Sequence, residues 1–362
     1  MEKLYVEQRN GKYRYILRYH DPKTGKVKRL ITTKSKYSKQ IYNDALRELQ
    51  DRAYGLQPDH VTLDKARELY IKDKERICKK QTVIKNDLIV GQINEWLDPD
   101  TYISQLNVTL LKTALLEHTV TNCSYNEKLR RYKVFLKWCY TNELIETSWY
   151  DKLTFLPDDH KARIEDKYLE SDELQKLLDS LELPLWYYVT YFLALSGLRI
   201  GELIALEDKD VDDKYIHVNK TYSLLTKEIG TTKTDGSTRD VFIQDELKVL
   251  IKRIRHFMKE FKFSRGIKSD LFFCSIHGNH LSYDAYRQYL FDHSKKSIGR
   301  AITPHALRHT CASILFGQGV PLDVVSRRLG HSDSDITKEI YIHVTKQLQE
   351  HDEKILKAVN IL

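Results

Sequence analysis

Hydrophobic and polar residues alternate through residues 4–33, as they do in strands that are buried on one side. The middle of this segment places Tyr13, Tyr15, Leu17 and Tyr19 on one face and Arg14, Ile16, Arg18 and His20 on the other. Asn10-Gly11 is a strong hairpin signal, and the run from Asp21 to Gly25 is typical of a second turn. The pattern therefore predicts three strands with one hydrophobic face.

A helix over residues 38–54 is expected to cover that face, because Ser38 is a favourable N-cap and Ile41, Ala45 and Leu49 follow at helical spacing. The outer face would then present the basic residues Arg14, Arg18, Lys26, Lys28 and Arg29. A small sheet can enter the major groove of DNA, where Arg and Lys bind guanine edges and phosphates. These five residues are therefore candidate DNA-binding residues.

From about residue 60 to residue 147, after a linker at residues 55–58, the apolar positions recur at helical spacing. One stripe contains Leu63, Ala66, Tyr70 and Ile77, and another contains Leu129, Tyr132, Leu136 and Cys139. Beside the second stripe lies a row of basic residues, Arg130, Lys133 and Lys137. A solvated helix face would explain such a row by itself. In combination with the rest of the chain, we favour contact with DNA phosphates.

Residues 148–167 are polar and charged, and we expect an exposed connector there. Structure is expected to resume at Tyr168, with Ser171 as the N-cap of the next helix. The longest apolar stretch, residues 183–198, is interrupted by proline and polar residues and is shorter than the roughly 20 residues that a membrane span needs. We therefore expect no membrane helix.

The charge of the chain is unevenly distributed. The 362 residues carry a formal charge of +8, and residues 1–54 contain 14 Lys and Arg against 6 Asp and Glu, which accounts for all of it. Such segregation favours a polyanion-binding module joined to a balanced body, with nucleic acid as the first candidate. The five cysteines are scattered without a CxxC pair, and the N-terminus lacks a secretory pattern, so a reduced intracellular protein is expected.

Four motifs in the last part of the chain contain candidate chemical residues. SGLRIGELIAL holds Arg199 just after a hydrophobic helix that ends at Gly197, with Glu202 as its expected ion-pair partner. TTKTDGSTRDVFI places Lys233 near a hairpin turn at Asp235-Gly236, with residues 239–243 as the return strand. TPHALRHT begins a helix at Thr303-Pro304, so His305 and Arg308 lie one turn apart. LGHSDSDITKEIYIH contributes His331 and Tyr341.

Taken singly, each of these residues is ordinary: a structural arginine, a solvated lysine, a structural histidine or tyrosine. A zinc site at His305 and His309 is disfavoured, because the glutamate of an HExxH motif is absent and Arg308 adds a positive charge. Together they form a donor-rich, cationic set suited to a phosphodiester. Tyrosine is un-ionised at neutral pH and needs a proton acceptor, which histidine supplies, while Lys233 is the candidate proton donor to the leaving oxygen.

The four motifs, in this order, resemble those of tyrosine recombinases, and specifically the integrases of phages and integrative conjugative elements in Gram-positive bacteria. The resemblance is strong over residues 168–343 and looser over about 60–150, while residues 1–54 resemble the arm-binding module of longer integrases. It implies a multidomain, mainly α protein with small β-sheets. The implied domains are an arm-type DNA-binding domain (1–56, a three-stranded sheet plus a helix), a helical, SAM-like core-binding domain (57–150), a linker (151–167) and an α+β tyrosine-recombinase catalytic domain (168–362).

The resemblance also implies a role for each motif residue. Tyr341 matches the nucleophile that forms a 3′-phosphotyrosyl link, and Arg199 and Arg308 match the clamp on the non-bridging oxygens, assisted by His331. His305 matches the general base, Lys233 the general acid, and Glu202 a residue that orients the arginine. The chemistry implies no metal, ATP or other cofactor.

The implied partners are double-stranded DNA, at core and arm attachment sites, and three further copies in a homotetramer on DNA. An excisionase and a DNA-bending host factor are candidate partners, no membrane is involved, and the expected location is the bacterial cytoplasm and nucleoid. Apolar residues after Tyr341, namely Leu348, Ile355, Leu356, Val359 and Leu362, are expected to dock on a neighbouring subunit or on their own domain.

Two alternatives remain at this point. A chromosome-dimer resolvase or relaxing topoisomerase would use the same chemistry, but the basic N-terminal module favours an integrase that inserts and excises a mobile element. A non-catalytic, sequence-specific DNA-binding regulator would bind DNA with a salt-dependent affinity and form no covalent intermediate.

Overall fold

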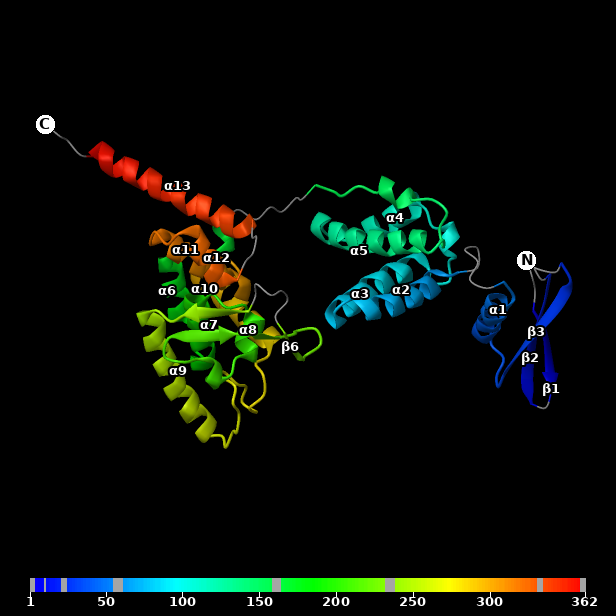
Figure 1. The fold of residues 1–362 in the computed structure, drawn as a ribbon, viewed down its shortest axis with the longest axis horizontal. Coiled ribbons are helices and arrows are strands. Elements are labelled where there is room, and N and C mark those ends of the chain that lie inside the picture. Colours follow the sequence, from blue (N-terminus) through cyan, green and yellow to red (C-terminus); the bar gives the residue numbers. More distant parts are fainter. Residues whose placement is uncertain are drawn as a thin grey trace. The chain divides into compact units, whose positions relative to one another are not determined.

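The computed structural model describes residues 4–9, 11–20, 25–54, 61–157, 164–231, 238–330 and 335–358. The chain divides into two compact units, Met1–Lys161 and Ala162–Leu362 (Figure 1). The first unit contains two separate hydrophobic cores, one under the N-terminal sheet and one within a group of helices. None of the helices in the described part of the chain has the length and apolar character that a membrane span requires.

The N-terminal sheet has the three predicted strands, β1 (Tyr5–Arg9), β2 (Lys12–His20) and β3 (Val27–Lys34), antiparallel in the order β1-β2-β3. Helix α1 (Lys39–Tyr54) lies beside the sheet in Figure 1, and the Ser38 hydroxyl accepts a hydrogen bond from the Ile41 amide at 3.1 Å. Tyr15 and Leu17 of β2 are fully buried against Ala45 and Leu49 of α1. The prediction of strands, helix and N-cap is confirmed.

The strand register decides which basic residues share the outer face of this sheet. Directly opposed residues of an antiparallel pair lie on the same face, and Arg18 lies opposite Arg29, while Arg14 lies opposite Glu7 and pairs with it at 2.9 Å. Lys28 lies opposite Tyr19, which belongs to the buried set. The expectation that all five basic residues share the outer face is therefore wrong for Lys28.

The helical part of the first unit contains α2, α3, α4 and α5 and two short 3-10 helices. Their bounds are Leu63–Ile77, Lys80–Leu97, Val108–His118 and Asn122–Thr141, with 3-10 turns at Ile103–Gln105 and Trp149–Lys152. The predicted α5 stripe is fully buried, and so are Leu63, Ala66 and Tyr70 of α2. Ile77, which was expected on the same face, is 69% exposed because it is the last residue of its helix.

The beginning of the expected connector belongs to this helical core. Tyr150 and Leu153 are buried among the helices, and the Lys133 ammonium donates a hydrogen bond to the Leu153 carbonyl at 3.1 Å. Residues 148–153 therefore belong to the helical core, and the expectation of an exposed connector from residue 148 is wrong for them. Lys133 and Arg130 also lie over the ring of Phe155, so this basic row holds the end of the helical core in addition to facing solvent.

The second unit is mostly helical. Its helices are a 3-10 turn at Ile164–Lys167, α6 (Ser171–Ser180), α7 (Pro184–Ser196), α8 (Ile200–Ala205), a 3-10 turn at Asp208–Asp210, α9 (Asp245–Phe263), α10 (Tyr283–Ile298), α11 (Pro304–Gly317), α12 (Leu322–Leu329) and α13 (Asp335–Ala358). The mainly α fold class with small sheets is confirmed. Ser171 is the first residue of α6 and not its cap, because Glu170 and Glu173 form a reciprocal capping box there.

Among the described residues of this unit, four short strands form two antiparallel pairs. They are β4 (Tyr215–Val218), β5 (Lys220–Tyr222), β6 (Ile229–Thr231) and β7 (Arg239–Phe242). The return strand expected after Asp235-Gly236 is present as β7, but it pairs with β4, while β6 pairs with β5. Among the described residues, β6 and β7 do not form the simple hairpin that the turn signal predicted; the turn itself lies outside the described residues.

Gly197 ends α7 where the sequence predicted, and it adopts a left-handed conformation with φ of 69°. A Cβ there would lie 2.6 Å from Leu329 Cδ2 and 3.1 Å from Cys311 Sγ, both in buried side chains. This close approach packs the end of α7 against α11 and α12, and it fixes the backbone two residues before Arg199.

Gly197→Ala should destabilise the second unit more than Gly299→Ala does. Both glycines have positive φ, so both substitutions carry a left-handed backbone cost of about 1–2 kcal/mol. Only Gly197 has neighbours that a Cβ would overlap, which adds about 1–3 kcal/mol of overpacking. Differential scanning calorimetry of the full chain measures the difference, and equal losses in the two variants would contradict the packing argument.

Candidate active site

Arg199 and Glu202 form the first part of the site. Arg199 is the N-cap of α8, and its amide and guanidinium both donate to the Glu202 carboxylate at 2.8 Å. Glu202 is almost completely buried, whereas about a third of the Arg199 side chain is exposed. The expected ion pair is therefore present, and it leaves part of the Arg199 guanidinium accessible from solvent.

Arg308 is fully buried on α11, and its guanidinium donates to backbone carbonyls. Its Nη1 donates to the Gly197 carbonyl at 2.6 Å, and its Nη2 donates to the Leu329 carbonyl. The Arg199 Nη2 donates to the next carbonyl, that of Gly330, at 3.3 Å. The two predicted arginines, 109 positions apart in the chain, are thus brought to neighbouring carbonyls at the end of α12.

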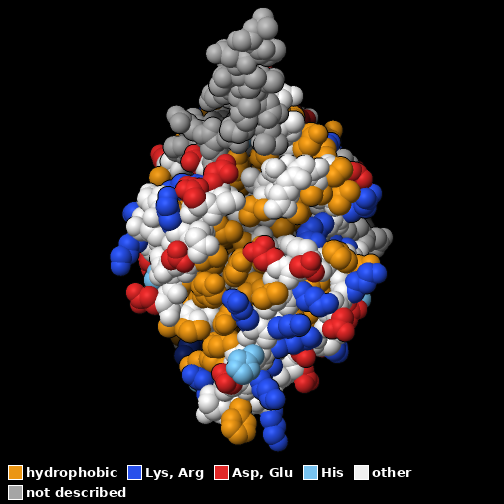
Figure 2. Space-filling view, turned by 90° about the vertical axis from the view of Figure 1, so that its left-hand side faces the viewer, with side chains coloured by type: hydrophobic (Ala, Val, Ile, Leu, Met, Phe, Trp, Pro, Cys, Tyr) orange, Lys and Arg blue, Asp and Glu red, His pale blue; other side chains and the backbone are white. Residues whose placement is uncertain are grey.

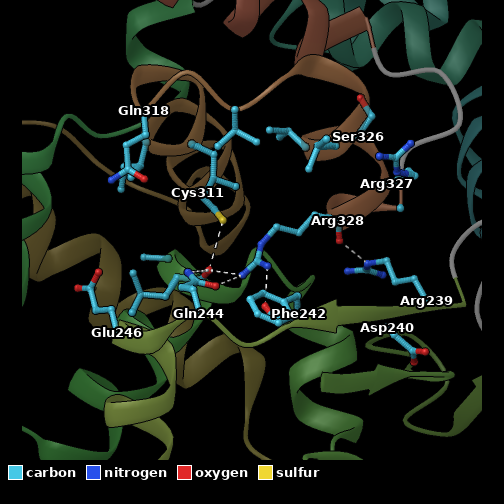
Figure 3. A pocket seen from close by; sticks show the side chains of 18 of the residues that line it. Arg239, Asp240, Phe242, Gln244, Glu246, Cys311, Gln318, Ser326, Arg327 and Arg328 are labelled. Carbon is cyan, nitrogen blue, oxygen red and sulfur yellow. Dashed lines mark hydrogen bonds between the residues drawn. The ribbon is translucent and has the colours of Figure 1, made fainter. Parts of the chain in front are cut away.

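Arg239 and Arg328 complete this network, and the sequence did not single out either of them. Arg239 donates to both Glu202 oxygens, at 3.1 and 2.9 Å, and its Nε donates to the Arg328 carbonyl at 2.7 Å. The Arg328 side chain donates to the Phe242 carbonyl at 2.7 Å (Figure 3). The sequence contains no local signal for these contacts, because their partners lie 37 to 89 residues away.

The electrostatics keep the cluster charged. Burial raises the pKa of Glu202, but hydrogen bonding to Arg239 and the charges of Arg239 and Arg199 outweigh it, so the net shift is downward. Burial and the nearby Arg199 lower the pKa of Arg308. The ordinary guanidinium pKa is so high that Arg308 still carries its proton at neutral pH. Among its described residues, the site therefore has more positive than negative charge.

His305 lies one turn before Arg308 on α11, as predicted, and its ring is 4.7 Å from the ring of His309. Desolvation by the surrounding protein lowers the pKa of His305, and the charges of Arg308 and Arg199 lower it further. Burial, His305 and Arg308 lower the pKa of His309 to about 4. Both rings are therefore neutral at pH 7, and among the described residues no three His, Cys, Asp or Glu side chains group to hold a metal.

Tyr341 lies on α13, which packs on α11 and α12 through Ile340 and Val344. Its ring is 5.2 Å from the ring of Phe316 and is about one-third exposed. Phe316 follows Arg308 by eight residues, which is about 12 Å along a helix axis. The two remaining candidates, Lys233 and His331, lie outside the described residues, as do the side chains of Leu348, Ile355 and Leu356 and the residues Val359 and Leu362.

Surface charge on one face of the molecule is mixed. In Figure 2, hydrophobic side chains gather near the centre, while Lys and Arg side chains are concentrated toward one side and acidic side chains are interspersed. This agrees with the equal numbers of acidic and basic residues after residue 54. The basic side chains on this face thus gather on one side, with acidic side chains among them.

Comparison with known proteins gives relatives with a consistent description. The chain is 33% identical over 177 residues to the integrase of Staphylococcus phage L54a, a match that covers 46% of this chain and 50% of that relative. It is 27% identical to the probable integrase of prophage ps2 of Lactococcus lactis subsp. lactis, over 97% of this chain and 98% of the relative. The chain thus spans half of the first relative and nearly all of the second.

The fold has solved counterparts. A lambda integrase, solved as a tetramer bound to a Holliday junction, has a TM-score of 0.58 and 17% identity, with 93% of this chain and 94% of that chain covered. This likeness concerns the fold. The phage integrase family model matches residues 167–348, half of the chain, including Arg199, His305, Arg308 and Tyr341. The chain therefore belongs to the phage integrase family of tyrosine recombinases.

Proposed function

We propose that this protein is a site-specific DNA integrase that cuts and rejoins DNA through a covalent link between Tyr341 and a 3′ phosphate. The observation that carries the proposal is the convergence of Arg199 and Arg308 on the adjacent carbonyls of Leu329 and Gly330. Two guanidinium groups fixed at one place bind the two non-bridging oxygens of a phosphodiester and stabilise the charge that develops during attack.

The proposed reaction consists of two successive transesterifications at phosphorus. The Tyr341 oxygen attacks phosphorus and its proton passes to neutral His305, while the bond from phosphorus to the 5′ oxygen breaks and that oxygen takes a proton from Lys233. His331 assists the two arginines. The 5′ hydroxyl of a partner strand then attacks the phosphotyrosine and releases Tyr341. The ester preserves the bond energy, so neither ATP nor a metal ion enters the balance.

Tyr341 is proposed to attack a phosphate that the arginine pair holds. The ring contacts Phe316, about two helical turns from Arg308. Ile340 and Val344, on either side of Tyr341, pack against α11 and α12. Attack on a phosphate at the arginine pair therefore requires the hydroxyl to approach Arg308.

Exchange between two duplexes needs four strand cuts, so the proposed active assembly is a homotetramer on double-stranded DNA. The solved tetramer of the lambda protein on a Holliday junction supports this stoichiometry. Residues 1–56 are proposed to bind arm sites, the helical part that ends at Leu153 core sites, and residues 168–362 the cleaved strand. An excisionase and a DNA-bending host factor are proposed as further partners for excision.

The basic row on α5 is proposed to contact phosphates near the crossover site. Arg130 and Lys137 are exposed, whereas Lys133 is partly engaged by the Leu153 carbonyl. In the N-terminal module, Arg14, Arg18 and Arg29 share the outer face, Lys26 is exposed, and Lys28 is exposed on the opposite face. The excess of positive charge in this module favours an integrase over a chromosome-dimer resolvase.

Covalent capture tests the nucleophile. Wild type should form an SDS-stable protein–DNA adduct with a nicked duplex tiled from the DNA that flanks the gene, in the presence of EDTA, and Tyr341→Phe should form none. The variant should bind the same duplex as wild type in an electrophoretic shift. No adduct from a duplex that wild type binds would favour a non-catalytic regulator.

The pH dependence of adduct formation tests His305. Because burial and the charges of Arg308 and Arg199 lower the pKa of His305, its ring takes up a proton at a lower pH than a free imidazole does, so the single-turnover rate should begin to fall at a lower pH than a free imidazole would give. In His305→Gln the rate should no longer fall at acidic pH, and the rate at neutral pH should be about 100-fold lower than in wild type. A wild-type rate that declines at a higher pH than the ordinary imidazole pKa allows, or a variant that still loses rate at acidic pH as wild type does, would exclude His305 as the base.

Charge neutralisation on the N-terminal sheet tests arm binding. Deleting residues 1–54 from the full chain should abolish binding to a subset of the tiled duplexes, which defines the arm sites. Arg18→Gln with Arg29→Gln should weaken binding to that subset and lower its salt slope by about 2. Lys28→Gln, on the opposite face, is the matched control and should change the slope less than either outer-face substitution. Equal effects would contradict the assigned face.

A further inference from the structure

Three consecutive carbonyls at the end of α12 each accept a hydrogen bond from a different arginine. The carbonyl of Arg328 accepts from Arg239, that of Leu329 from Arg308 and that of Gly330 from Arg199. Two of these donors are the proposed phosphate-binding arginines. Arg239 is the third member of the row, and the proposed mechanism gives it no part.

Arg239 also shares the buried carboxylate of Glu202 with Arg199. Oε1 accepts from Arg199 Nη1 at 2.8 Å and from Arg239 Nη1 at 3.1 Å, while Oε2 accepts from the Arg199 amide at 2.8 Å and from Arg239 Nη2 at 2.9 Å. Only 6% of the Arg239 side chain and 2% of the Glu202 side chain are exposed. Arg239 uses Nε, Nη1 and Nη2 on the Arg328 carbonyl and the Glu202 carboxylate, so it fixes the group that orients Arg199.

A second contact runs in the reverse direction between the same two elements. The Arg239 side chain on β7 holds the α12 backbone at Arg328, and the Arg328 side chain on α12 holds the β7 backbone at Phe242, at 2.7 Å in each case (Figure 3). Arg328 also donates to Gln244 Oε1 at 2.7 Å and to the Leu195 carbonyl at 3.1 Å. This pair of reciprocal contacts, the arginine clasp, fixes β7 against α12.

The arginine clasp lies between two candidate residues in the sequence. Arg239 follows Lys233 by six residues, and Arg328 precedes His331 by three. The clasp therefore fixes the described ends of the two segments that carry Lys233 and His331. Arg239 also contacts Glu202, which binds Arg199. The Arg239 side chain is therefore linked to the motifs that contain Arg199, Lys233 and His331.

We propose that Arg239 is a positioning residue for strand cleavage, which orients Arg199 through Glu202 and fixes β7 on α12. The inference rests on the proposed integrase function. Arg239 binds both oxygens of Glu202 through Nη1 and Nη2, which requires the planar guanidinium group. At the same time the Arg239 Nε donates to the Arg328 carbonyl. A lysine can preserve the charge but supplies only one nitrogen, so it cannot hold both partners in this geometry.

The test compares Arg239→Met, Arg239→Lys and wild type in single-turnover adduct formation at saturating nicked duplex. A positioning error at a phosphoryl-transfer site costs about 100-fold in rate, so Arg239→Met should lose about that factor while its Kd for the duplex changes by less than about threefold. Arg239→Lys should recover only part of the loss. Arg255→Met is the matched control, because Arg255 also binds a carboxylate and backbone carbonyls, at Asp208 and Val211, away from the Glu202 cluster.

A neutral scissile linkage distinguishes positioning from loss of fold. If Arg239 acts through Arg199 on phosphate charge, replacing the scissile phosphate by a methylphosphonate removes most of the charge that it helps to stabilise. The rate ratio of wild type to Arg239→Met should then shrink to below about tenfold. Melting temperatures of the Arg239 and Arg255 variants, measured alongside, show whether the two substitutions destabilise the unit equally.

Three results would overturn the proposal: an Arg239→Met rate equal to that of wild type, an equal loss of rate in Arg255→Met, or an Arg239→Met defect of the same size on the neutral linkage. A failure of wild type to form any adduct would instead overturn the proposed function. The two failures are therefore distinguishable in one experiment.

Discussion

The structure of the site depends on the last carbonyls of α7 and α12, which have no donors within their own helices. A helix leaves its last carbonyls without intrahelical donors, and these carry partial negative charge. Here the donors come from arginines: Gly197 at the end of α7 accepts from Arg308, and the carbonyls that end α12 accept from Arg239, Arg308 and Arg199. The same arginines therefore supply the missing hydrogen bonds at two helix ends and form the proposed phosphate clamp.

Glu202 makes this arrangement possible in a buried place. A carboxylate taken out of water is costly unless it is paired and hydrogen-bonded on all sides, and Glu202 accepts four hydrogen bonds, three of them from guanidinium groups. One negative charge among three arginines leaves the cluster positive. The carboxylate thus orients Arg199 without neutralising the field that a phosphodiester needs.

In the N-terminal module, the strand register determines which basic side chains share a face. Its small core of Tyr15, Leu17, Ala45 and Leu49 buries one face of a three-stranded sheet, and the other face is free to present arginines. Because side chains alternate strictly along a strand, the register alone decides which cations act together. Arg18 and Arg29 are cross-strand neighbours, whereas Lys28, one residue away in sequence, belongs with Tyr19.

The sequence by itself determined the elements and the candidate chemistry. Strand alternation, the Ser38 cap, the Gly197 stop and the Thr303-Pro304 helix start depend on residues within a few positions of each other, and all of these are present as expected. The arginine pair was found because its motifs are local in the same sense. Ser171 failed as a cap only because neighbouring Glu170 forms a capping box with Glu173.

Tertiary structure decided the rest. The pairing of β7 with β4, the exposure of Ile77 and the face of Lys28 depend on strand register and on where a helix ends in three dimensions. The role of Arg239 depends on partners 37 and 89 residues away, and Arg199 meets Gly330 across 131 residues. An arginine at the start of a strand can find hydrogen-bond partners in many conformations. The packing of α12 against β7 determines which partners Arg239 has here. Long-range packing therefore chose the positioning residue that local pattern left unassigned.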